Sequence, residues 1–158
     1  MKKYPLITII VILSTLIVVT ALHIFYRTYQ QRHFSCTTYF QSKQRKENLS
    51  VGAIFRFIFI GNKGIVTFSG EVIDSSGIHH ALNRQMLFTF SKLGNVYLLV
   101  SQRRISQSND EANDDLMRKV IPPFYFLENK TIQYTIERQK NGDYIITNGK
   151  TQISYCRQ

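Results

Sequence analysis

Residues 51–72 read VGAIFRFIFIGNKGIVTFSGEV, and this stretch decides the fold. Apolar side chains occupy every second position on both sides of a Gly-Asn-Lys-Gly turn at residues 61–64. Because successive side chains of a β-strand point to opposite faces of a sheet, this alternation predicts two half-buried strands. The inward face of the first strand is formed by Val51, Ala53, Phe55, Phe57 and Phe59. A short turn between such runs is typical of an antiparallel hairpin.

The alternation continues to the end of the chain, with one interruption. Further strands are expected at residues 34–40, 82–91, 96–105, 132–137, 144–147 and 153–156, separated by Gly- and Asn-containing turns. In the interruption, Ser108 and Glu111 have the spacing of a helix capping box, and Pro122 and Pro123 end the helical pattern. The meander is expected to resume at residues 124–127. The sequence therefore predicts an all-β domain, an antiparallel meander forming a sandwich or a small barrel, with one short helix.

A long apolar run precedes this domain. Residues 6–26 contain no Asp, Glu, Lys or Arg, and about 20 such residues cross a bilayer core of roughly 30 Å. The run predicts a single transmembrane helix behind a short N-terminus at residues 1–5. A juxtamembrane stalk at residues 27–33 and the β domain at residues 34–158 follow it.

Two other interpretations of the apolar run are a cleaved secretory signal and a buried globular helix. Lys2 and Lys3 form a basic start, and Val19-Thr20-Ala21 resembles a cleavage site. The run is longer than a usual signal core and stays apolar through residues 22–26, which favours an uncleaved anchor. Basic residues flank both ends, so charge alone leaves the orientation almost undecided. The signal-like start and the cysteines favour a cytoplasmic N-terminus and an exported, periplasmic C-terminal domain.

Charge and motifs limit the function classes. From Phe34 onward, sixteen lysines and arginines face ten acidic residues, and the basic residues are scattered singly rather than clustered. We therefore expect no nucleic-acid partner. No nucleophile, phosphate-binding or metal-ligand motif is apparent, so the sequence predicts neither an enzyme nor a cofactor or metal site. The adjacent His79 and His80 fit a surface pair beside a turn, or an acid sensor.

Cys36 and Cys156 are the only cysteines, and they lie near the two ends of the predicted β domain. In an oxidising compartment such a pair predicts a disulfide that joins the first strand to the last. Two buried free thiols are the alternative.

The aromatic strand faces indicate a core or a ligand cavity, since a small antiparallel barrel can enclose one apolar ligand. The candidate cavity-lining residues are Phe55, Phe57, Phe59, Phe68, Phe88 and Phe90. Three arginines lie among apolar neighbours and are candidate contacts for a ligand carboxylate: Arg56, Arg84 and Arg104. Ordinary core packing of the phenylalanines and outward-facing arginines are the alternatives.

The whole chain resembles the FidL-like membrane proteins of enteric bacteria. The residues that carry the resemblance are the N-terminal anchor, Cys36, Ile54-x-Phe-x-Phe-x-Gly61, Gly64-x-Val-x-Phe-Ser-Gly70, Asn83-Arg84, Phe88-Thr-Phe90 and Ser154-Tyr-Cys156. These are structural signatures, and the family has no catalytic residues to transfer.

The resemblance implies an inner-membrane accessory protein. FidL-like proteins are similar in role to ToxS, the partner of a one-pass transcription activator of the ToxR/CadC type. By that resemblance, the periplasmic domain is an incomplete lipocalin-like barrel that the activator completes or stabilises, with a shared cavity for an amphiphile such as a bile acid. A stand-alone periplasmic binder of lipids or bile acids, without a regulator partner, is the alternative.

Overall fold

The computed structural model describes residues 4–45 and 47–158; Lys2 and Lys3, used above in the orientation argument, lie outside them. The chain divides into two compact units between His33 and Phe34, at the predicted start of the β domain.

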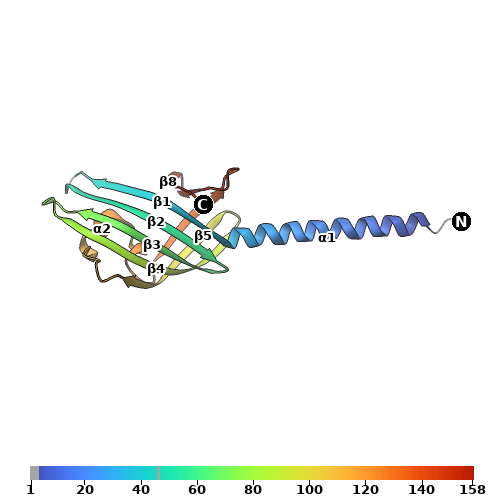
Figure 1. The fold of residues 1–158 in the computed structure, drawn as a ribbon, viewed down its shortest axis with the longest axis horizontal. Helices are drawn as coiled ribbons and strands as arrows, with labels where there is room; N and C mark the ends of the chain where they lie inside the picture. Colours follow the sequence, from blue (N-terminus) through green and yellow to red (C-terminus); the bar gives the residue numbers. More distant parts are fainter. Residues whose placement is uncertain (1–3, 46) are drawn as a thin grey trace. The chain divides into compact units, whose positions relative to one another are not determined.

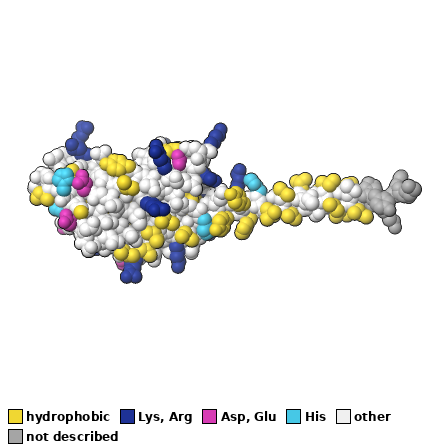
Figure 2. Space-filling view, in the orientation of Figure 1, with side chains coloured by type: hydrophobic (Ala, Val, Ile, Leu, Met, Phe, Trp, Pro, Cys, Tyr) yellow, Lys and Arg dark blue, Asp and Glu magenta, His cyan; other side chains and the backbone are white. Residues whose placement is uncertain are grey.

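The first unit is one α-helix, α1 (Tyr4–Arg32). Its segment Ile7–Arg32 is long and apolar enough to cross a membrane. Figure 2 shows hydrophobic side chains along the visible face of the helix, and the exposed apolar residues at successive positions 9–13 and 16–19 point to every side of it. An apolar helix with no polar face is not suited to water, so this unit fits a membrane anchor.

The predicted stalk at residues 27–33 is helical through Arg32, because α1 continues without a break beyond the apolar run. Side chains one turn apart support this extension: Gln30 Nε2 donates to the Tyr26 hydroxyl at 2.6 Å. The His33 ring stacks on Tyr29 with centroids 4.0 Å apart. Such i,i+4 pairs stabilise a helix end.

The second unit is an eight-stranded antiparallel barrel in which each strand pairs with the next in the chain (Figure 1). The strands are β1 (His33–Gln44), β2 (Leu49–Ile60), β3 (Lys63–Ile73), β4 (His79–Leu93), β5 (Val96–Ser106), β6 (Thr131–Arg138), β7 (Tyr144–Asn148) and β8 (Thr151–Cys156). The predicted meander is confirmed, and of the two predicted architectures the chain forms the barrel.

The alternation read from residues 51–72 sets the register of β2 and β3. Val51 pairs with Val72 and Phe55 with Phe68, so the apolar faces of both strands point into the barrel. The turn is shorter than predicted, because Gly64 already belongs to β3. A Cβ atom at Gly64 would lie 2.3 Å from Cζ of Phe88, so only glycine fits beside that ring.

The short helix is present but begins later than predicted. Helix α2 spans Asp114–Val120, and its N-cap is Asn113 rather than Ser108; the Asn113 side chain accepts a hydrogen bond from Leu116 N at 2.9 Å. The predicted capping-box residue Glu111 instead accepts a bond from Ala81 N of β4 at 3.3 Å. Cross-strand bonds to β4 therefore hold the residues before the helix.

The expected return to strand at residues 124–127 is also wrong. Pro123–Tyr125 forms a single 3-10 turn, η1, whose aromatic side chains are buried, and β6 starts only at Thr131. Proline lacks the N–H that a strand ladder needs, which explains the turn. Lys119 Nζ of α2 lies 2.6 Å from Glu47 Oε2, so the connection between β5 and β6 reaches the β1–β2 turn at one end of the barrel.

Candidate functional site

The weakest junction of the barrel is its seam, where β1 meets the chain end formed by β8 and Arg157. One isolated bridge joins the two sides: Thr37 N donates to Arg157 O at 2.7 Å, and Arg157 N donates to Thr37 O at 2.8 Å. Beside this bridge Cys36 and Cys156 form a disulfide, the predicted pairing, with Cα atoms 5.3 Å apart. Within the described residues, no ladder continues from the bridge along β1 and β8.

An apolar cavity of about 240 Å³ lies under the seam. Its lining comes from the inner faces of β1, β2, β6, β7 and β8 and from the segment that follows α2. The lining residues are Thr38, Phe40, Phe55, Phe57, Ile121, Pro122, Tyr125, Tyr134, Ile146, Asn148, Ile153 and Ser154.

A pair of hydroxyl groups is the main polar feature of this cavity. Tyr125 and Tyr134 are both buried, and their hydroxyl oxygens lie 2.6 Å apart. Burial raises the pKa of Tyr125 well above its ordinary value, and burial raises the pKa of Tyr134 to about 12 despite the opposing hydrogen bond from Tyr125. Both phenols are therefore neutral at physiological pH. One O–H donates to the other oxygen, which leaves the second O–H as a donor toward a ligand acceptor.

The six predicted phenylalanines separate into two groups. Phe55 and Phe57 line the cavity. The other four are buried in the packed core of the β2–β5 side and do not line the cavity: Phe59, Phe68, Phe88 and Phe90. Phe59 lies at their centre, with ring centroids 5.3 Å from Phe88 and 5.2 Å from Phe90. These four rings are therefore packed in the core, which was the alternative to a cavity-lining role.

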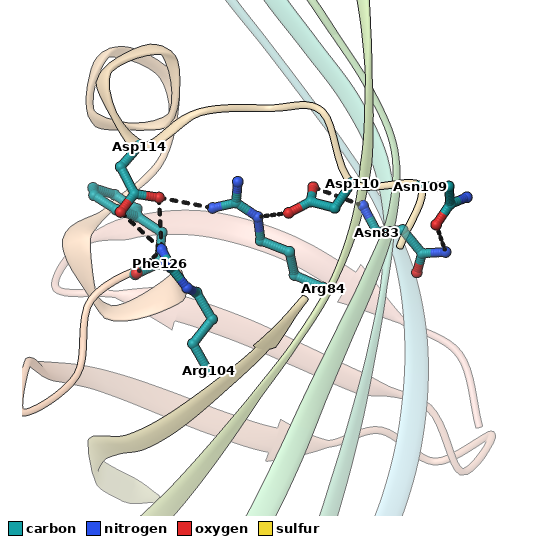
Figure 3. Close-up of polar contacts among 7 residues, drawn as sticks. All are labelled: Asn83, Arg84, Arg104, Asn109, Asp110, Asp114 and Phe126. Carbon is teal, nitrogen blue, oxygen red and sulfur yellow. Dashed lines mark hydrogen bonds and ion pairs between the residues drawn. The ribbon is translucent and has the colours of Figure 1, made fainter. Parts of the chain in front are cut away.

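The three candidate arginines occupy different surroundings. Arg84 and Arg104 meet at the end of the barrel covered by the β5–β6 connection, where they bind the protein's own carboxylates (Figure 3). Arg84 is only 4% exposed, and its Nε donates to Asp110 Oδ2 at 2.5 Å. Arg56 lies exposed on the outer face of β2, because position 56 alternates with the inward-facing Phe55 and Phe57. None of the three lines the cavity.

Asp114 joins the two arginine side chains into one network. Arg104 Nη1 donates to Asp114 Oδ1 at 2.6 Å and to the Phe126 carbonyl at 3.0 Å, and Arg84 Nη1 donates to Asp114 Oδ1 at 3.1 Å. Partial burial alone would raise the pKa of Asp114, but the hydrogen bonds and charges of Arg104 and Arg84 outweigh it and lower the pKa. The network therefore fastens α2 and η1 over the barrel end rather than presenting an open anion site.

The two histidines lie at the turn between β3 and β4 and bond to different acids. His79 Nδ1 lies 2.8 Å from Glu71 Oε2, and His80 Nε2 lies 3.0 Å from Asp74 Oδ2. The His80 hydrogen bond is the main cause that lowers the pKa of Asp74. Within the described residues, no group of three or more His, Cys, Asp or Glu side chains is arranged to hold a metal ion.

Sequence reasoning missed the tyrosine pair and the seam residues of the cavity. Tyr125 and Tyr134 are nine residues apart on a turn and a strand, and nothing in their spacing predicts that their hydroxyls meet. The inward position of Thr38 follows from the alternation of β1, but the opening beside it depends on where the edges of β1 and β8 separate.

Comparison with known proteins places most of the chain in one family. No curated protein and no solved structure matches the chain. Residues 25–156, which include the end of α1 and the barrel from β1 to β8, match the family described as YqeJ C-terminal domain. The chain belongs to the YqeJ C-terminal domain family.

Proposed function

We propose that this protein is a membrane-anchored accessory protein whose barrel binds a second protein along the seam. The observation that carries this proposal is the seam itself: two strand edges separate above an apolar cavity after a single bridge. Unpaired strand edges offer N–H and C=O groups to a further strand, and strand addition is a common way to bind a partner.

The size of the cavity favours a protein partner over a small ligand alone. Pockets for drug-sized ligands usually measure about 300–1,000 Å³. The cavity of about 240 Å³ is smaller, so an amphiphile of the size of a bile acid needs additional lining. A strand added at the seam supplies that lining and covers the exposed Tyr39 of β1 and the half-buried Ile153 of β8.

The partner that we propose is a one-pass transcription activator of the ToxR/CadC type. This identity rests on the FidL-like resemblance of the sequence. We further propose that α1 lies in the bacterial inner membrane, with the N-terminus in the cytoplasm and the barrel in the periplasm. The disulfide supports this orientation, because such bonds persist in oxidising compartments.

Site-specific photo-crosslinking in living cells tests the proposal. A photoreactive amino acid replaces Tyr39 on β1 in the full chain, and a matched variant carries it at Ile54, which is exposed on the outer face of β2. We expect the Tyr39 variant, but not the Ile54 variant, to capture a one-pass membrane protein with a cytoplasmic winged-helix domain. Identical products from both positions, or products of another class, would contradict the proposal.

A second candidate function is the binding of an amphiphile without a partner, favoured by the tyrosine hydroxyls in a mostly apolar cavity. Calorimetric titration of cholate into the full chain in lipid nanodiscs, with empty nanodiscs as the baseline, distinguishes the two. Saturable binding by the protein alone that is weakened in Tyr125→Phe would favour this candidate. Cholate binding by the crosslinked complex, but not by the protein alone, would favour a cavity shared with the partner.

A further inference from the structure

The turns at one end of the barrel expose large apolar side chains. Strand β1 begins at His33, directly after the last residue of α1, so this end of the barrel is the one joined to the helix. Antiparallel order places the start of β1 beside the β2–β3 turn, and it places the β4–β5 turn at the same end. Ile60, the last residue of β2, is 61% exposed, and Leu93, the last residue of β4, is 85% exposed.

Such exposure is costly in water. An exposed leucine or isoleucine forgoes the free energy that burial of its side chain would release. A groove of about 500 Å³ on the outer face of the barrel continues from Ile60 and is lined by further apolar side chains of β2, β3 and β4. The groove residues are Ile58, Ile60, Lys63, Gly64, Ile65, Leu87, Phe88, Thr89 and Gln102. Ile60 is therefore part of a larger apolar surface, and Leu93 is a second exposed apolar side chain outside this groove.

The helix-joined end of the barrel carries more basic than acidic side chains, whereas the opposite end carries both kinds in similar number. Basic side chains lie in or beside the turns of the helix-joined end: Lys63, Lys92, Arg138, Lys140 and Arg157. The turns and connections of the opposite end hold most of the acidic residues together with basic ones, among them Arg45, Arg104, Arg118, Lys119, Lys130 and Lys150. Among the described residues, Glu137 and Asp143 are the acids of the helix-joined end. Exposed apolar tips flanked by lysines match an anionic lipid surface.

The length of α1 brings that surface within reach. Residues 7–26 span about 30 Å of hydrocarbon at 1.5 Å per residue. The remaining residues 27–32 add about 9 Å, which is close to the thickness of one headgroup layer. Strand β1 follows α1 without a linker, so the chain tethers the start of β1 close to the end of the helix.

We propose that the helix-joined end of the barrel rests on the bilayer, with Ile60 and Leu93 inserted at the headgroup boundary and Lys63 and Lys92 beside lipid phosphates. The occupant of this surface is the lipid of the membrane that holds α1. The proposal rests on α1 crossing the membrane, and it is independent of the partner and of the cavity ligand.

A single tryptophan reports this contact, because the chain contains none. The variant Leu93→Trp is reconstituted as the full chain in vesicles of phosphatidylethanolamine and phosphatidylglycerol with brominated acyl chains. The matched control is Ile78→Trp, since Ile78 is a 57% exposed apolar residue in the β3–β4 turn at the opposite end of the barrel. Unchanged circular dichroism and protected cysteines show that both variants are folded.

We expect bromine to quench the Leu93→Trp variant roughly threefold more than the control, since interfacial apolar residues lie about 5–10 Å deep in the headgroup boundary. Adding Lys63→Glu and Lys92→Glu should reduce that quenching in phosphatidylglycerol vesicles and leave it nearly unchanged in vesicles of phosphatidylcholine alone. Equal quenching of the two tryptophan positions would overturn the proposal. Crosslinking at Tyr39 tests the partner and tryptophan quenching tests the membrane contact. Failure of one experiment therefore leaves the other proposal unaffected.

Discussion

Strands β2 and β3 pair without interruption from Ser50 and Ile73 to Ile60 and Lys63, whereas β1 and the chain end share one bridge and a disulfide. The first region, which we call the wall (β2–β5), is held by long ladders and a cluster of aromatic rings. The seam is held by a covalent bond. The barrel therefore closes without a complete ladder at the seam, which leaves strand edges there for another chain.

Removal of the disulfide is expected to have the largest effect on stability. Cys36→Ser or Cys156→Ser opens a loop with a sequence separation of 120 residues, for which chain entropy corresponds to about 4–5 kcal/mol of unfolding free energy. We expect each variant to lose that amount, the double variant to be no worse than either, and partner binding to weaken in all three. Urea unfolding of the full chain with and without reductant measures the loss. A native protein whose stability is insensitive to reductant would show that the seam does not depend on the bond.

The second test removes a buried aromatic ring from the centre of the wall. Phe59 is 1% exposed and touches several rings, so Phe59→Ala should lower the unfolding free energy by about 4 kcal/mol through lost burial and a cavity. Phe40→Ala at the seam is the matched control, because Phe40 is only half-buried and should cost about 2 kcal/mol. The two losses are compared by urea unfolding. Equal losses would mean that the seam is packed as tightly as the wall.

The third test concerns the arginine that joins the wall to the β5–β6 connection. Arg84→Met leaves the buried Asp110 carboxylate without its cation and should cost about 3–4 kcal/mol. The double variant Arg84→Met, Asp110→Leu removes both charges and should recover most of that loss. Urea unfolding of the single and double variants measures both effects. If the double variant is as unstable as Arg84→Met, the ion pair is not the source of the stability.

The sequence predicted the wall well, because its period-two pattern is local. The residues that alternate in the stretch 51–72 are the ones that face the core, and the two cysteines do join the first and last strands. The start of α2 was misplaced because Asn113 competes with Ser108 as N-cap, and Glu111 bonds to β4 instead. Capping boxes are read from local spacing, whereas β4 lies some 30 residues away in the chain.

The candidate site was predicted only in part, since it depends on distances between strands far apart in sequence. Phe55 and Phe57 were found because they face inward, but Phe59 on the same face is covered by other rings. Arg84 was predicted to contact a ligand carboxylate or to face outward, and only the packed structure shows that Asp110 of the chain is its partner. The opening of the seam has no local sequence signal.

The fourth test concerns the pH dependence of stability that the buried tyrosine pair should cause. Burial raises the pKa of Tyr134 from 10.0 to about 12, so the folded state keeps this proton to a higher pH than the unfolded state does. The stabilisation is complete below about pH 10 and is lost as pH rises to about 12, with a size of about 2–3 kcal/mol. Urea unfolding across this range should show the decline, and Tyr134→Phe should make it shallower. An unchanged slope in Tyr134→Phe would assign the decline to other groups.

The smallest effect on stability is expected at the seam itself. A substitution there should reduce partner binding while it leaves the unfolding free energy nearly unchanged. Ile153 lines the cavity but is 39% exposed, so Ile153→Ala should lower the unfolding free energy by at most about 1 kcal/mol. The matched control is Ile54→Ala, which removes the same atoms from a 53% exposed side chain on the outer face of the wall. Both variants should unfold at nearly the same urea concentration. Only Ile153→Ala removes apolar surface from the place where a partner strand would lie, so it alone should reduce the yield of crosslinked partner at Tyr39. An equal reduction in both variants would mean that the yield follows stability, and the seam would then have no special role in binding.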